Sequence, residues 1–181
     1  MIEIPKNWAD LPEDERFLFY SYMGWALSNF AAVIVDYDGR IWLTAEHAYQ
    51  AAKFKGGSYD SNKQRVYDKI YRAPDPLAAK QIAYSWAYTE FVRPDWEYVK
   101  LQVMLDIKRA QVAGSVNLMN AIIKFSKFGK VWLVEDSSKD AYWGRGKDWC
   151  GLNNLGIVYM IIMEEHLNDG YSELREQLGL I

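Results

Sequence analysis

Residues 31–55 read AAVIVDYDGRIWLTAEHAYQAAKFK, and this stretch decides the fold class. Two apolar runs flank Asp38-Gly39, which is a hairpin signal because glycine tolerates the positive φ that such a turn needs. Thr44 then provides a cap for a helix over residues 45–55, which is expected to end before Gly56-Gly57. A hairpin followed at once by a helix predicts a fold that mixes strands and helices.

The rest of the chain is mostly helical in pattern. Apolar spacing and turn signals predict further helices over residues 62–70, 77–84, 96–112, 116–125 and 155–167, a strand over 131–134, and a loop over 136–154. No repeat, low-complexity tract or long linker interrupts the chain. We therefore expect an α+β fold, rich in helix with a small β-sheet or hairpin, in one domain over 1–181 whose motif-bearing core is about 17–168.

Composition narrows the function classes. The formal net charge of −3 argues against a general nucleic-acid coat, which needs excess Lys and Arg to neutralise phosphates. Eight Trp and thirteen Tyr fill a core or line a pocket for a flat ring. The single cysteine, Cys150, excludes an intramolecular disulfide, which suits a reducing cytoplasm. Residues 17–35 carry no formal charge, but their polar and aromatic content favours a buried strand and loop over a membrane span.

The first candidate for chemistry is the helix predicted after Thr44. Glu46, Gln50 and Lys53 share one face at i, i+4 and i+7, so an acid, an amide and a cation are presented together. On spacing alone, the ordinary interpretation is a solvated face with a weak Glu–Lys pair. His47 has no second histidine at i+4, so the zinc-protease pattern is absent and no metal is expected.

Two further clusters stand out. The strand ending at Glu135 leads into a loop with Asp140, Trp143, Gly144 and Arg145, where glycine lets a ligand approach the backbone closely. The same loop also fits an acidic surface loop with structural aromatics. In residues 93–100, Arg93 and Lys100 are candidates for phosphate binding; equally, Asp95 caps the next helix and Trp96 staples it.

Taken together, these segments resemble the YbiA-type, or NADAR, family. The resemblance spans about residues 27–167 and follows the family order. It rests on Leu27-Ser28-Asn29-Phe30; Trp42-x-Thr44-x-Glu46-His47-x-x-Gln50-Ala51-x-Lys53-Phe54; Arg93-x-Asp95-Trp96 with Lys100 and Met104; Leu133-x-Glu135-x-Ser137-x-x-Asp140-x-x-Trp143-Gly144-x-Gly146; and Gly151-x-Asn153-x-Leu155-Gly156. The segments 83–89 and 111–130 depart from the usual pattern, which bears on the substrate more than on the reaction class.

The resemblance implies an N-glycosidase that needs no cofactor. Family members are associated with hydrolysis of ribosylamino-pyrimidine phosphates from early riboflavin synthesis, and others with removal of ADP-ribose from modified guanine in nucleic acid. Matching positions here are acidic (Glu46, Asp140), aromatic (Trp96, Trp143) and polar (Asn29, Lys53, Glu135, Asn153). A non-catalytic module that binds ADP-ribose or a related nucleotide is the rival from another class.

An N-riboside cleaves through a sugar cation, while the leaving base needs a proton or a hydrogen-bond donor. We therefore expect Glu46 to activate water and stabilise the cation, and Asp140 to act on the ribose hydroxyls or the leaving group, although the two roles are interchangeable at this stage. Trp96 or Trp143 is expected to stack on the base, and Lys53, Arg93 or Arg145 to hold phosphate. The expected ligand is a phosphorylated riboside or an ADP-ribose adduct.

Overall fold

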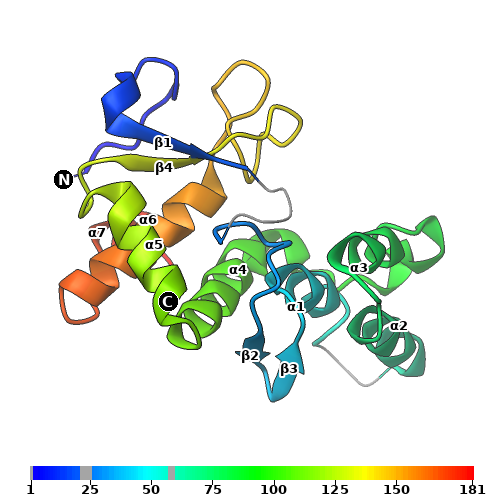
Figure 1. Cartoon of the computed structure of the whole chain (residues 1–181). Coiled ribbons are helices and arrows are strands. Elements are labelled where there is room, and N and C mark those ends of the chain that lie inside the picture. Colours follow the sequence, from blue (N-terminus) through cyan, green and yellow to red (C-terminus); the bar gives the residue numbers. More distant parts are fainter. Residues whose placement is uncertain (1, 21–25, 57–59) are drawn as a thin grey trace. The chain divides into compact units, whose positions relative to one another are not determined.

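The computed structural model describes residues 2–20, 26–56 and 60–181. Contacts divide the chain into two compact units. The central unit, named for its place in the sequence, is Asn29–Gly114, and the terminal unit is Met1–Ser28 together with Ser115–Ile181. The α+β prediction is confirmed, since several helices accompany two small two-stranded sheets (Figure 1). The extent of the predicted single domain stays a prediction.

The central unit begins with the predicted hairpin. Strands β2 (Val35–Tyr37) and β3 (Arg40–Trp42) pair antiparallel, with Val35 opposite Trp42. The turn residues Asp38 and Gly39 have φ angles of 58° and 74°, the positive values for which the sequence was suited. The indole of Trp42 is buried and donates to the carbonyl of Tyr37 at 3.0 Å, which fastens the hairpin.

Helix α1 (Ala45–Ala52) follows the hairpin and contacts every other major element of the central unit: β2, β3, α2 (Ser61–Tyr71), α3 (Pro76–Ala83) and α4 (Trp96–Ala113). A short 3₁₀ helix, η2 (Trp86–Phe91), precedes α4. Four of the eight α1 residues are alanine, which lets neighbouring helices approach closely, and all eight are buried. The predicted solvated face of this helix is therefore wrong: α1 has no side left for water.

The boundaries of the central helices follow from capping. Thr44 accepts a hydrogen bond from the backbone amide of His47 at 3.3 Å, and Asp75 caps α3 with Pro76 at its first position. Helix α1 ends at Ala52, three residues before the predicted end, and is followed by the turn residues Lys53 and Phe54. Gly56 has a φ of 104°, as a residue after a helix often does, whereas Gly57 lies outside the described residues.

The terminal unit pairs two strands that are distant in sequence. After the 3₁₀ helix η1 (Glu13–Glu15), strand β1 (Arg16–Phe19) runs parallel to β4 (Trp132–Glu135), and Phe19 lies opposite Glu135. The connection between these strands contains the whole central unit, which is why periodicity alone did not predict the pairing. The part of residues 17–35 that the structure describes is strand and loop, as expected, while residues 21–25 lie outside it.

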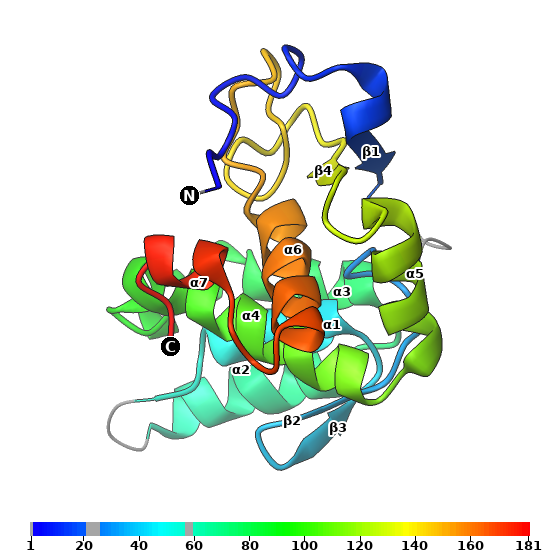
Figure 2. The ribbon, with the colours of Figure 1, turned by 90° about the vertical axis from the view of Figure 1, so that its left-hand side faces the viewer.

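Three helices complete the terminal unit. Helix α6 (Asn154–Leu167) packs on β4 and contacts α5 (Val116–Ser126) and α7 (Glu173–Gln177) (Figure 2). Residues 154–163 of α6 are all buried, so this helix forms the core of the unit. The sequence predicted α5 and α6 but not α7. No helix within the described residues is long and apolar enough to cross a membrane.

Candidate active site

The predicted site residues belong to both units. The central unit contains Asn29, Glu46, Lys53, Arg93 and Trp96, and the terminal unit contains Glu135, Asp140, Trp143, Gly144, Arg145 and Asn153. The central set gathers around α1. The carbonyl of Asn29 accepts from the amide of Glu46 at 3.0 Å, and the amide of Arg93 donates to the carbonyl of Lys53 at 2.8 Å. Backbone hydrogen bonds therefore place two of the predicted residues at opposite ends of the helix.

Glu46 is a buried carboxyl group that accepts a hydrogen bond from the side chain of Gln50. Its side chain is 4% exposed, and Nε2 of Gln50, one turn later, donates to its Oε1 at 2.8 Å. Burial raises the pKa of Glu46 above its ordinary value, because a charged carboxylate loses its hydration; the Gln50 hydrogen bond and the charges of Lys80, Lys53 and Lys108 oppose that rise. A carboxylate with a raised pKa is a stronger base at neutral pH than a solvated one.

Lys53 is a buried cation on the same helix face. It is 6% exposed, and its Nζ lies 4.0 Å from the ring centroid of Tyr84 and 5.9 Å from those of Tyr49 and Trp96. Burial lowers its pKa to about 8, while the negative charge of Glu46 acts in the opposite direction. Tyr84 belongs to the aromatic segment 83–89 that departs from the family pattern, so this segment helps to surround a predicted site residue.

The other two residues of the central set have structural contacts of their own. Trp96 is buried and packs on Tyr49 with ring centroids 5.1 Å apart. Arg93 binds both carboxylate oxygens of Asp95, at 2.6 and 2.7 Å, and Asp95 makes no side-chain cap to α4. The prediction that the Asp95 side chain caps α4 is therefore wrong. A phosphate bound at Arg93 would share the guanidinium group with the Asp95 carboxylate.

Sequence reasoning missed two charged residues that act on Glu46, Lys80 and Lys108. Lys108 in α4 is fully buried, and its Nζ donates to Oε1 of Gln111 at 2.9 Å. Its charge lowers the pKa of Glu46, together with those of Lys53 and Lys80. The signal was present in the sequence: Met104, Lys108 and Gln111 follow each other at i, i+4 and i+7, and all three are buried. A lysine among buried positions of an amphipathic helix indicates a polar cluster inside the fold.

Within the terminal unit, the loop after β4 uses its charged side chains to hold its own shape. Oδ1 of Asp140 accepts from the amides of Tyr142 and Trp143, at 3.0 and 2.8 Å. Arg145 forms an ion pair with Asp136, donates to the carbonyl of Gly146 at 2.9 Å, and stacks over Trp149. These contacts give Asp140 and Arg145 a structural role in the loop beside the catalytic or binding role that the sequence predicted.

Asn153 and Gly144 are also anchored by backbone. Asn153 is fully buried; its Oδ1 accepts from the amide of Glu135 at 2.9 Å and its Nδ2 donates to the carbonyl of Leu133 at 2.9 Å. A Cβ on Gly144 would lie 2.7 Å from that of Ser137 and 3.0 Å from the carbonyl oxygen of Glu135. Close backbone approach inside the loop therefore requires this glycine. Binding roles for both residues stay predictions.

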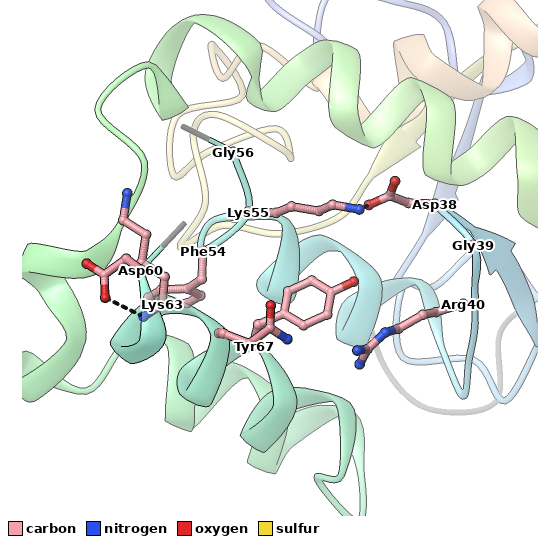
Figure 3. Close-up of a pocket in the computed structure, with 10 residues that line it drawn as sticks. Asp38, Gly39, Arg40, Phe54, Lys55, Gly56, Asp60, Lys63 and Tyr67 are labelled. Carbon is pink, nitrogen blue, oxygen red and sulfur yellow. Dashed lines mark hydrogen bonds and ion pairs between the residues drawn. The ribbon is translucent and has the colours of Figure 1, made fainter. Parts of the chain in front are cut away.

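A cavity of 420 Å³ lies elsewhere in the central unit. Its lining includes Arg40, Lys55, Lys63 and Tyr67, and Lys55 forms an ion pair with Asp38 across it (Figure 3). Glu46, Gln50 and Lys53 do not line this cavity. Arg40 is likewise paired, with Asp68 at 3.0 Å. Since two of its three cations are already neutralised by carboxylates, the cavity is a weaker candidate site than the Glu46 cluster. Among the described residues, no His, Cys, Asp and Glu side chains group to hold a metal ion.

Comparison with known sequences gives the class to which this fold and cluster belong. The sequence model of the NADAR domain matches residues 16–166, and the chain belongs to the NADAR domain family. The match begins at β1 and ends within α6, so it includes residues of both units.

Particular relatives carry functional names. The chain is 35% identical to the N-glycosidase YbiA of Escherichia coli over 153 residues, which are 84% of this chain and 81% of that protein. It is 34% identical over 139 residues to a riboflavin biosynthesis protein of Vibrio vulnificus, covering 77% of this chain but only 35% of the longer relative. The solved NMR structure of E. coli YbiA superposes with a TM-score of 0.70 at 29% identity, over 93% of this chain and 96% of that one.

Proposed function

We propose that this protein is an N-glycosidase that hydrolyses the bond between ribose and base in ribosylamino-pyrimidine phosphates of riboflavin synthesis. The observation that carries the proposal is the buried Glu46, held by Gln50 and accompanied by Lys53, in a chain of the NADAR family. Relatives named as N-glycosidases and as riboflavin biosynthesis proteins support the reaction and the substrate class.

The reaction needs one water and two proton movements. The bond between C1′ and the base nitrogen breaks, the nitrogen takes a proton, and the oxygen of water bonds to C1′ as it loses one. Glu46 accepts the proton from water and stabilises the positive charge that develops on the sugar, because its raised pKa makes it a competent base. The products are the free heterocycle and ribose 5-phosphate.

Cationic side chains suit the phosphate of such a substrate. Lys53 is the first candidate, since it lies seven residues after Glu46, at the C-terminal cap of α1, and its charge acts on Glu46. Arg93 and Arg145 are the others, each already paired with an aspartate. For the base, the aromatic rings of Trp96 and Trp143 stay the proposed stacking partners.

Asp140 is the proposed second carboxylate, and one variant isolates its charge from its structural role. In Asp140→Asn the amide oxygen still accepts from the backbone of Tyr142 and Trp143, so the loop keeps its hydrogen bonds. We expect kcat to fall by about 100-fold or more with the thermal unfolding midpoint unchanged. Full activity in a folded Asp140→Asn protein would restrict its role to the loop.

The substrate is tested by comparing two probes in the same chromatographic product assay. The wild-type protein is incubated with a ribosylamino-pyrimidine 5′-phosphate and, separately, with an oligonucleotide carrying ADP-ribosylated guanine. We expect release of pyrimidine and ribose 5-phosphate from the first probe. Faster release of ADP-ribose from the second would assign the alternative activity, and stoichiometric binding without turnover of either would indicate a nucleotide-binding module.

A cytoplasmic location is part of the proposal and rests on cysteine usage.

A further inference from the structure

Two buried oxygen atoms beside Glu46 accept no hydrogen bond from the described part of the chain. They are Oε1 of Gln50 and Oδ1 of Asn29. Buried polar atoms in folded proteins almost always have a partner, because burying an acceptor without one costs free energy. Both residues bond directly to Glu46: Gln50 through its side-chain amide and Asn29 through its backbone carbonyl. The unmet acceptors therefore belong to two residues that are hydrogen-bonded to Glu46, one at its carboxylate and one at its backbone amide.

The orientation of Gln50 is set by chemistry. Its amide nitrogen donates to the Glu46 carboxylate at 2.8 Å, and an amide oxygen in that place would meet a second acceptor instead. The oxygen of Gln50 must therefore turn away from Glu46, and the side chain is only 2% exposed. Within the part of the chain that the structure describes, the Asn29 side chain makes one weak hydrogen bond, from Nδ2 to the sulfur of Met104 at 3.8 Å. Neither oxygen is needed to build the fold.

We propose that Asn29 and Gln50 are specificity residues whose unmet oxygens accept hydrogen bonds from the two hydroxyl groups of a ribosyl cis-diol. This inference rests on the proposed function, since it places C1′ of the sugar at Glu46. The hydroxyls on C2′ and C3′ are the donors nearest to C1′ on the part of the substrate that stays the same before and after cleavage. Two neutral donors match two neutral acceptors, and a buried unpaired acceptor rejects a ligand that lacks the donor.

The first test compares a ribosylamino-pyrimidine 5′-phosphate with its 2′-deoxyribosyl and 3′-deoxyribosyl counterparts. We expect one of the variants Asn29→Leu and Gln50→Met to reduce the ratio of kcat/KM values for ribosyl over 2′-deoxyribosyl, and the other to reduce the ratio for ribosyl over 3′-deoxyribosyl, each by about 10-fold or more relative to wild type. Asn29→Asp and Gln50→Glu keep an acceptor oxygen and should keep more of the ratio. Because ratios are compared between variants, the greater intrinsic lability of deoxyribosides cancels. A change that merely disturbs Glu46 slows all three substrates equally and leaves both ratios unchanged.

A second measurement does not depend on turnover. Calorimetric titration with ribose 5-phosphate and with 2-deoxyribose 5-phosphate should show tighter binding of the ribose compound by about 10-fold or more in wild type, and loss of that preference in one of the two variants, Asn29→Leu or Gln50→Met. The two failures are then distinguishable: absent hydrolysis with retained ribose preference overturns the proposed function, whereas normal hydrolysis without ribose preference overturns the present inference.

The unfolding temperature of Asn29→Leu is a third test, because a role of Asn29 in ligand binding and a role in the fold predict changes in opposite directions. Replacing an unmet acceptor by an apolar group of similar shape removes a cost of the folded state, so Asn29→Leu should unfold a few degrees above wild type. A lower unfolding midpoint together with unchanged sugar preference would show that Asn29 serves the fold, and would overturn its assignment to the diol.

Discussion

Glu46 and Lys53 are shifted toward their neutral forms by the same cause. Both lie on the buried helix α1, where a charge loses hydration, so the pKa of the acid rises and that of the base falls to about 8. Their mutual attraction opposes both shifts. Burying these two ionisable groups lowers the stability of the folded state. Such a cost is usual for ionisable groups at functional sites.

The raised pKa of Glu46 predicts how Glu46→Gln changes stability with pH. The folded state binds this proton more tightly than the unfolded state, whose value stays near 4.5, so the contribution of protonated Glu46 is fully present below 4.5 and is lost as pH rises through the folded pKa. The free energy of unfolding of Glu46→Gln relative to wild type should therefore increase with pH from about 4.5 upward and then level off. Urea titrations at several pH values measure it, with Glu90→Gln, an exposed position, as the control. A pH-independent difference would contradict the burial of this charge.

The lowered pKa of Lys53 predicts that its side-chain amine titrates near pH 8. The resonance of its Cε carbon, assigned by its absence in Lys53→Arg, should shift with a midpoint near pH 8, well below the ordinary 10.5. Because the folded pKa is depressed, the stability contributed by neutral Lys53 is fully present above 10.5 and is lost as pH falls through about 8. A midpoint at the ordinary value would show that this amine is solvated.

At the scale of elements, local chemistry made the central hairpin and the helix starts predictable. Asp38-Gly39 specifies its own turn, and Thr44 and Asp75 satisfy helix amides within three residues of themselves. The burial of α1 on all sides was not predictable from its spacing, because it depends on five neighbouring elements. The parallel pairing of β1 with β4 was missed for the same reason, since its partners are joined by a very long connection.

The junction between β4 and α6 is another element whose importance was only partly visible. The Asn153 side chain hydrogen-bonds to both the amide of Glu135 and the carbonyl of Leu133 in β4, and a Cβ on Gly156 would lie 2.0 Å from the carbonyl oxygen of Leu133. We expect Asn153→Ala to lower the free energy of unfolding by about 3 kcal/mol and Gly156→Ala by at least as much. Urea unfolding measures both. Gly114→Ala, whose Cβ would meet its nearest atom at an ordinary 3.6 Å, is the matched control and should change little. Equal effects of the two glycine variants would contradict the close packing of α6 on β4.

At the scale of the whole molecule, family membership and reaction class were predictable because motif residues follow one another in order along most of the chain. The roles of single residues were harder to predict. Asp140, Arg145 and Asn153 carry motif chemistry and also hold backbone in the structure, and sequence does not separate these two uses. Glu46 differs from them, since among the described residues its carboxylate accepts one hydrogen bond, from Gln50, whose own amide oxygen is unmet.

The most direct test of the account is the hydrolysis of a ribosylamino-pyrimidine 5′-phosphate by wild type and Glu46→Gln, with released ribose 5-phosphate measured in single-turnover experiments. Glutamine preserves the volume of the side chain but cannot accept a proton from water. We predict that Glu46→Gln folds normally and that its rate of cleavage falls by about 100-fold to 10,000-fold. A folded Glu46→Gln protein that cleaves at the wild-type rate would contradict the assignment of Glu46 as the catalytic base.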